Sequence, residues 1–265
     1  MIVYGRELRR NAKGLAIWSA VMCGYILLLL SMYPQFAADQ EAMQQMLEAY
    51  PDSLKQAFGM DALNYGDVLG YYGVQIYMFI TLIGSIYAAM LAGGILVKEE
   101  NEKTVEFLLS KPISRAEVVL QKLAAAFTNL LVFNALMAAA SLAGFRLSND
   151  DAAMNVYVLF ATGAFLLHAA FASIAFLLSA VLRKSRSIVS ASLGLVFFSY
   201  ALHIAAGVSE PLRPLAELSL FHYVDAADIA TNESIEAAYV AAMLALSALC
   251  LLGAFLYYKR KDITV

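Results

Sequence analysis

The chain reads KEENEKTVEFLLSKPISRAE from Lys98 to Glu117, between two long apolar runs. Five of these twenty residues are Glu and four are Lys or Arg. Val105, Leu108 and Leu109 recur at helical spacing and form a narrow apolar stripe beside the charges. The pattern predicts a short amphipathic helix at a membrane surface, which has the character of a docking element. An ordinary charged loop between two membrane helices is the alternative.

The second half of this stretch predicts a helix boundary. Pro112 ends the first helix, because an internal proline removes a hydrogen bond and clashes with the preceding turn. Ser114 and Glu117, three residues apart, match the capping-box pattern that opens a helix. We therefore expect a short helix, a break and a new helix start.

The composition predicts an integral membrane protein. The 265 residues are 62% hydrophobic and 15% charged, and the mean hydropathy is +0.69. Soluble domains carry about a quarter charged residues. The two cysteines, Cys23 and Cys250, lie in apolar runs, where thiols usually act as small hydrophobes. Their number and spacing give no disulfide framework and no metal-ligand pattern.

Six apolar runs predict six membrane spans in one transmembrane domain of residues 1–265. Crossing about 30 Å of hydrocarbon takes about 20 helical residues, and runs without alternating polarity exclude a β-barrel. The first run is a retained span and not a signal peptide, because Gln35 and Phe36 stand where a cleavage site needs small residues. The fold class is therefore all-α, with spans at about 15–33, 69–97, 117–145, 156–182, 187–208 and 237–258.

Charge predicts the orientation of the spans. The segments 1–14, 98–122, 183–186 and 259–265 hold fifteen of the eighteen Lys and Arg residues, and the opposite loops hold fourteen of the twenty-one acids. Basic residues stay on the cytoplasmic side of membrane proteins. We therefore expect cytoplasmic N and C termini, with the segment 98–117 on the same side.

The outer loops and the small-residue faces each leave alternatives open. The loop 34–68 carries apolar residues at helical spacing, which fits either an outer gate or a helical loop resting on the bundle. The loop 209–236 contains Pro211 and Pro214 and predicts a structured turn. Small residues repeat every four positions at Gly84, Ala88 and Ala92, and again at Ser190 and Gly194, which indicates either packing within the chain or a dimer interface.

Charge is nearly absent inside the predicted spans. We expect Lys122 to extend from the third span toward the cytoplasm. His168 is the deepest titratable residue, and we expect it to be a satisfied packing residue. No Asp, Glu, Lys or Arg lies at mid-membrane in the predicted spans, which argues against a self-standing ion pump. His203 and His222 fall on separate elements near the outer face and do not by themselves predict a metal site.

Common catalytic patterns do not occur in the sequence. It lacks the GxxxxGK[ST] loop that holds ATP phosphates, the GxSxG elbow and the HExxH zinc motif. The pair Glu99-Glu100 invites comparison with an EExxxR protease motif, but Thr104 stands where Arg is required.

The run AGGILVKEENEKTVEFLLSKPISRAEVVLQKL (92–123) resembles the signature stretch of type-2, export-type ABC transporter permeases. In that family the second span ends in an acidic pair, followed by a Thr/Ser-aromatic-leucine helix and a Pro-x-Ser-Arg turn. Here these are Glu99-Glu100, the helix from Thr104 to Leu109, and the turn 112–115. The basic segment 4–13 resembles the family's interfacial elbow helix. The run LSLFHYVD (218–225) is similar to a segment before the last span, with Leu220 where many relatives have proline.

The resemblance implies a permease subunit that works with a separate ABC ATPase, present in two copies, and with a second permease copy or a related permease. ATP and Mg would be held by the ATPase, so no cofactor is expected in this chain, and no nucleic acid partner. Membrane lipids surround the spans, and the implied location is a prokaryotic plasma membrane. The implied ATPase-docking residues are Glu99, Glu100, Lys103, Thr104, Val105, Phe107, Leu108, Leu109, Pro112 and Arg115, and the elbow residues are Arg6, Arg9 and Arg10.

Three functions follow from these observations. The first is ATP-driven export of a hydrophobic or amphipathic substrate through this permease. The second is an intramembrane enzyme, for which Glu99, Glu100 and His168 are the candidate residues. The third is a membrane anchor of a sensory complex, in which no substrate moves.

Overall fold

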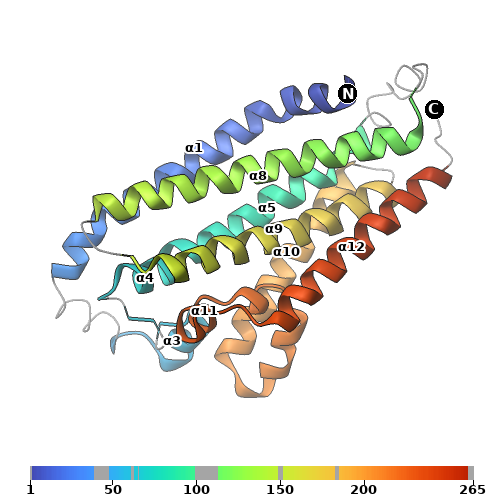
Figure 1. Ribbon diagram of the computed structural model, residues 1–265. Coiled ribbons are helices and arrows are strands. Elements are labelled where there is room, and N and C mark those ends of the chain that lie inside the picture. Colours follow the sequence, from blue (N-terminus) through green and yellow to red (C-terminus); the bar gives the residue numbers. More distant parts are fainter. Residues whose placement is uncertain are drawn as a thin grey trace.

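The computed structural model describes residues 2–38, 48–60, 63–64, 66–98, 113–148, 152–182 and 185–261. Every regular element in these ranges is helical (Figure 1), and six helical segments are long and apolar enough to cross a membrane. The predicted all-α fold with six spans is therefore confirmed. In chain order the spans are α1 (Ile2–Ala38), α5 (Met78–Gly93) preceded by α4 (Val68–Tyr71) and the π-helix η1 (Tyr72–Tyr77), α8 (Arg115–Leu147), α9 (Met154–Val181), α10 (Ser185–Val208) and α12 (Ala237–Arg260).

The first helix is longer than the apolar run that predicts it. The run covers 15–33, whereas α1 extends from Ile2 to Ala38 and passes through Pro34. Its N-terminal turns are held against α8, where Gln121 Oε1 accepts hydrogen bonds from the N–H groups of Val3 at 3.1 Å and Tyr4 at 3.3 Å. Those N–H groups have no partner within their own helix. The basic segment is therefore continuous with the span.

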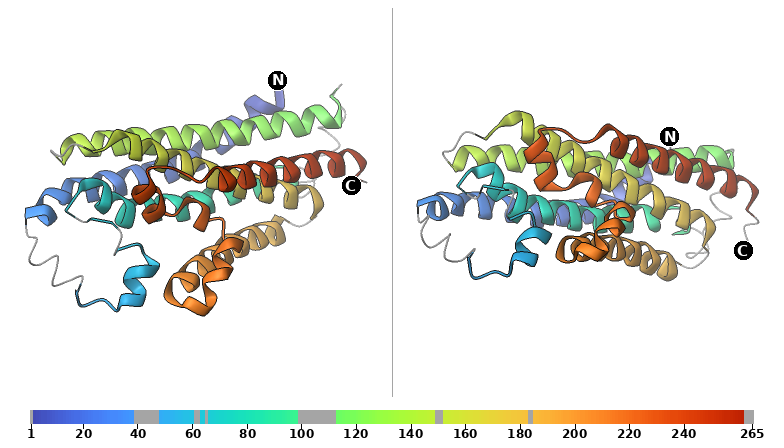
Figure 2. Two further views of the ribbon diagram at one scale, coloured as in Figure 1. Left: turned by 60° about the horizontal axis from the view of Figure 1, so that its bottom comes forward. Right: turned by 90° about the horizontal axis from the view of Figure 1, so that it is seen from below.

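The bundle is arranged around α9. This helix packs along α5 and α12 and also contacts α8 and α10, while α1 packs along α8 at the edge of the bundle (Figures 1 and 2). Both termini lie at one end of the bundle, as an even number of spans requires (Figure 1). We call this end the terminal end and the other the loop end.

Small residues let α5 approach α9 closely. A Cβ added at Gly84 would lie 2.2 Å from Nε2 of His168 on α9, and both Ala88 and Ala92 are buried. The face of Gly84, Ala88 and Ala92 therefore packs within the chain. At Gly194 on α10, by contrast, a Cβ would meet no atom of the described molecule within 4 Å.

Between α4 and α5 the second span contains a π-helical turn that the sequence did not indicate. The wider turn η1 carries Tyr72 and Tyr77, whose side chains are buried. The hydroxyl of Tyr72 lies 2.9 Å from Ser141 Oγ on α8, and the hydroxyl of Tyr77 donates to the Val224 carbonyl at 3.1 Å. Such turns are rare and often mark functional sites.

Short helices form the loop end. The predicted helical outer loop contributes α3 (Asp52–Ala57) among its described residues, while Met43 and Met46 lie outside them. The predicted turn before the last span consists of the 3-10 helices η2 (Glu210–Leu218) and η3 (His222–Val224), followed by α11 (Ala226–Asn232). Asp225 caps α11 by accepting hydrogen bonds from the N–H groups of Ala227 at 2.8 Å and Asp228 at 3.2 Å.

The predicted capping box at the start of α8 is confirmed. Ser114 Oγ accepts a hydrogen bond from the Glu117 N–H at 3.2 Å, and Glu117 Oε2 accepts one from the Ser114 N–H at 2.9 Å. Each side chain satisfies an N–H group that the helix leaves without a partner. The start of α8 is therefore fixed directly after the predicted docking segment.

Candidate functional site

Most of the predicted docking residues lie outside the described part of the chain. The range 99–112 contains Glu99, Glu100, Lys103, Thr104, Val105, Phe107, Leu108, Leu109 and Pro112, so their role stays a prediction. The structure describes both flanks of this range: the turns that follow α5 up to Lys98, and the start of α8 from Ile113. These flanks, together with the ends of α1 and α12, form the candidate site.

A buried ion pair joins α1 and α8 beside the range 99–112, and a hydrogen bond links it to the turns after α5. Lys122 on α8 donates a hydrogen bond to the carbonyl of Ile95, in the turns after α5, and its Nζ lies 3.9 Å from Glu7 Oε1 on α1. Both charged side chains are completely buried, with 0% of each exposed. We call this set of three residues the Glu7–Lys122 junction.

The junction corrects the expectation that Lys122 extends toward the cytoplasm. The ammonium turns inward because a carboxylate on α1 and a carbonyl released at the end of α5 are both within its reach. Two charges removed from solvent carry a large desolvation cost, which their attraction offsets only while both partners are present. The position of α1 relative to α8 therefore depends on this pair.

Two further contacts hold neighbouring elements to the first turns of α8. Gln121 holds the N-terminus of α1, as described above, and Arg115 Nη1 donates to the carbonyl of Lys261, at the end of α12, at 2.7 Å. In the turns after α5, the Leu96 N–H donates to Ser179 Oγ on α9 at 3.0 Å. The start of α8 thus contacts the ends of α1, α5 and α12 within eight residues of sequence.

The predicted elbow residues lie on the first turns of α1. Arg9 and Arg10 are exposed and Arg6 is half-buried. Because α1 continues without a break into the span, these residues are carried rigidly by the same helix that presents Glu7 to Lys122. Their interfacial role stays a prediction.

His168 is the polar centre of the bundle at mid-span. Its Nδ1 lies 2.9 Å from Asn134 Oδ1 on α8, and its Nε2 lies 3.0 Å from the Ile80 carbonyl on α5. The ring is fully buried and bridges three helices. This agrees with the prediction of a packing residue, since the ring is enclosed by three helices and each nitrogen lies beside a polar atom of a neighbouring helix.

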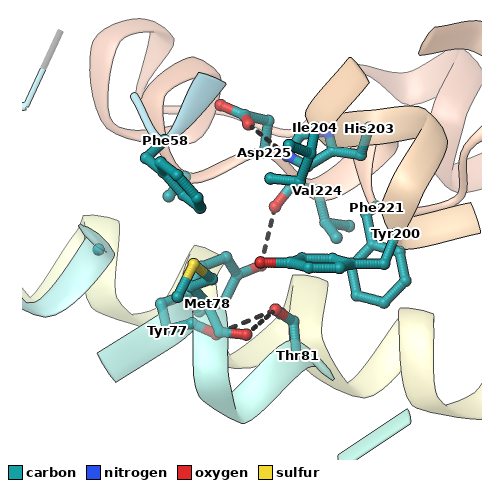
Figure 3. A pocket seen from close by; sticks show the side chains of 12 residues that line it. Phe58, Tyr77, Met78, Thr81, Tyr200, His203, Ile204, Phe221, Val224 and Asp225 are labelled. Carbon is teal, nitrogen blue, oxygen red and sulfur yellow. Dashed lines mark hydrogen bonds and ion pairs between the residues drawn. The ribbon is translucent and has the colours of Figure 1, made fainter. Parts of the chain in front are cut away.

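A small cavity opens at the loop end, between the second span, α10 and the segment before α11 (Figure 3). Its volume of about 40 Å³ is enough for water molecules and too small for a drug-sized ligand. His203 Nε2 lies 3.3 Å from Asp225 Oδ2 on one side, and the ring of Phe58, which follows α3, lies on the other. The first outer loop thus reaches over a polar contact between α10 and the segment before α11.

His203 and His222 face different neighbouring side chains. His222 Nε2 faces Glu217 Oε1 at 3.9 Å and the Tyr239 hydroxyl at 3.5 Å, whereas His203 faces Asp225. Among the described residues, no group of three His, Cys, Asp or Glu side chains has the arrangement of a metal site.

Comparison with known proteins gives the family. Residues 1–263 match the model of the ABC-2 family transporter proteins, which covers almost the whole chain. The chain belongs to the ABC-2 transporter family. A search of curated proteins found no match. The predicted resemblance is therefore confirmed, and the six-helix bundle is a multi-pass permease subunit of an ABC transporter.

The sequence did not predict the partners that hold this ABC-2 permease together at its terminal end. Glu7 is the one acid in a basic segment, and Lys122 is a cation at the edge of an apolar run, so each is unusual where it stands. Their pairing follows only from the packing of α1 on α8.

Proposed function

We propose that this ABC-2 permease docks a separate ABC ATPase through the segment 98–117 and exports a hydrophobic or amphipathic substrate. ATP and Mg are held by the ATPase. Two permeases and two ATPases form the working transporter, in a prokaryotic plasma membrane.

The observation that carries the proposal is the set of contacts at the start of α8. Residues 99–112 of the docking segment are joined covalently to the turns after α5 on one side and to the start of α8 on the other. A displacement of that segment acts at once on Lys122, and through Lys122 on Glu7 and α1. The bond from Arg115 to the Lys261 carbonyl carries the same displacement to α12.

The docking chemistry is that of an amphipathic helix in a groove. Val105, Phe107, Leu108 and Leu109 provide the apolar anchors, and flanking charges such as Lys103 fix the register. The basic residues near the two termini and in the segment 98–122 favour the cytoplasmic side for this end, where an ATPase meets ATP.

Co-purification tests the proposal. Membranes are solubilised in mild detergent, and the proteins retained with the permease are identified by mass spectrometry. We expect an ABC ATPase with the wild type and its loss from the double variant Val105→Asp, Leu108→Asp. Leu218→Asp is the matched control, since Leu218 is exposed on η2 at the opposite end and should retain the ATPase.

Transport provides the second measurement. Leu108→Asp should abolish ATP-dependent substrate movement in cells, because the coupling contact is lost. An ATPase that stays bound to the double variant, or transport that survives Leu108→Asp, would overturn the assignment of 98–117. A folded wild type that retains no ATPase would overturn the transporter proposal itself.

A further inference from the structure

A second cavity lies within the spans, between α8, α9 and α12. Its volume is about 200 Å³, several times that of the cavity at the loop end. Small side chains form much of its wall, including Ala126, Ala169 and Ala172. Larger apolar residues, among them Phe127, Met243 and Leu244, complete it.

The packing of the three helices explains the cavity. Helix α12 packs along α9 and meets α8 only briefly, so a wedge remains between α8 and α12 with α9 as its floor. A large residue at Ala169 on the floor would fill this wedge. The alanines leave it open.

The wall of the cavity is hydrocarbon, and it has no hydrogen-bond donor free to bind a guest. Two hydroxyls line it, and each donates to a carbonyl of its own helix: Ser173 Oγ to Ala169 at 2.7 Å and Ser247 Oγ to Met243 at 2.8 Å. All other lining residues are apolar. A cavity of this kind stays dry and takes apolar guests, as a 150 Å³ apolar cavity takes benzene. A headgroup or an ion would find no partner here.

The depth and the opening of the cavity point to the bilayer interior. The α8 residues that line it, 123–130, lie about 12–22 Å along the helix from Arg115, at 1.5 Å per residue. That range includes the middle of a hydrocarbon layer about 30 Å thick. At the rim, the side chains of Phe127 and Leu244 are 48% and 54% exposed. The mouth therefore faces the tails of the surrounding lipids.

We propose that this cavity binds the terminal section of a lipid acyl chain. The bilayer provides no hydrophobic driving force for the chain, so selection depends on van der Waals fit in the wedge. The volume admits a guest somewhat larger than benzene, which fits the end of one chain and excludes a whole lipid. The site does not depend on docking of an ATPase.

Photolabelling of the reconstituted permease tests the site. The protein is placed in phosphatidylcholine vesicles that contain a phosphatidylcholine with a diazirine near the end of one acyl chain. After illumination, labelled residues are mapped by mass spectrometry. We expect label on Ala169, Ser173 and Met243 in the cavity, and also on Leu252, which is exposed on the outer face of α12. A diazirine placed beside the headgroup should leave the cavity residues unlabelled.

Filling the cavity provides the decisive comparison. Ala169→Leu should lower the label on Ser173 and Met243 about tenfold, the change that corresponds to about 1.4 kcal/mol, and leave Leu252 unchanged. Ala248→Leu makes the same change on an exposed position of α12 and should preserve the cavity label. Ser247→Leu fills the wedge from α12 and replaces Ala169→Leu if that variant does not fold. Equal cavity labelling in the filled and control variants, or none in the wild type, would overturn the proposal.

Discussion

At the scale of single residues, the molecule depends most on two charges that water does not reach. Glu7 and Lys122 are fully buried, and neither carboxylate oxygen of Glu7 has a hydrogen-bond partner in the described part of the chain. The attraction of the Lys122 ammonium therefore offsets part of the cost of burying the Glu7 carboxylate. Removing one partner of such a pair typically costs about 3–5 kcal/mol, whereas replacing both by apolar residues is often neutral.

We predict that Glu7→Met and Lys122→Met each lower the free energy of unfolding by about 3–5 kcal/mol. The double variant should be more stable than either single variant, since it removes both charges of this pair together. Thermal unfolding in detergent provides the measurement. Its readout is the loss of the monodisperse size-exclusion peak of the folded protein after heating. Simple addition of the two single effects would contradict the pairing.

Asp228 gives a prediction about pH at the loop end. Burial raises the pKa of its carboxyl above the ordinary value of 3.8, and the nearby Asp225 carboxylate raises it further, while His222, His203 and Arg213 offset part of the effect. A carboxyl with a raised pKa ionises less readily in the folded state than in the unfolded state. The folded state therefore loses stability as pH rises from below 3.8 through the raised pKa.

Asp228→Asn removes this penalty. We expect the variant to melt at a higher temperature than the wild type at pH 7 and at the same temperature below about pH 3.8. Asp225→Ala is the contrasting control. Asp225 caps α11, and its Oδ2 lies 3.3 Å from His203 Nε2, so removal of its side chain leaves the first N–H groups of α11 without their acceptor and should lower the melting temperature at pH 7. A melting temperature of Asp228→Asn that equals the wild type at pH 7 would contradict the prediction.

At the scale of elements, the contact between α5 and α9 depends on one glycine. Gly84 leaves just enough room for the ring of His168, which bonds to the Ile80 carbonyl one turn earlier on the same helix. We predict that Gly84→Ala destabilises the bundle by about 1–3 kcal/mol, because the methyl group would overpack the contact. Gly194→Ala is the matched control: it meets open space on α10 and should be neutral or stabilising by up to about 1 kcal/mol. Thermal unfolding of the two variants in one detergent separates them, and similar losses would contradict the model of a tight α5–α9 contact.

The helices themselves follow largely from the sequence, because lipid leaves a long apolar run few alternatives to a helix. The runs 117–145 and 187–208 differ from α8 and α10 by only a few terminal residues. The capping box at Ser114 was readable because it is a local pattern. What the sequence could not reveal depends on packing between distant segments. The N-terminal turns of α1 are helical beyond their apolar run because Gln121 and Lys122 hold them. The π-turn at Tyr72 has no local pattern at all.

At the scale of the whole molecule, the family and the six spans were predictable, while the docking residues from Glu99 to Pro112 still rest on the resemblance. The physical reason is that a docking surface is defined by its partner. On the described flanks, Arg115, Gln121 and Lys122 contact three helix ends, which is the connection our proposal uses. The orientation of the bundle decides whether this end can meet an ATPase in the cytoplasm.

Orientation is testable because both ends carry exposed positions. In a background with Cys23→Ser and Cys250→Ser, single cysteines replace Arg9 and Lys259 at the terminal end and Arg213 at the loop end, all of them exposed. We predict that a membrane-impermeant maleimide labels Arg213→Cys in intact cells and labels Arg9→Cys and Lys259→Cys only after permeabilisation, because the basic residues gather at the terminal end.

Labelling of Arg9→Cys in intact cells would place the termini outside and separate the segment 98–117 from any cytoplasmic ATPase. Opposite labelling of Arg9→Cys and Lys259→Cys would contradict the even number of spans, since helices that cross the membrane six times must return the chain to its starting side.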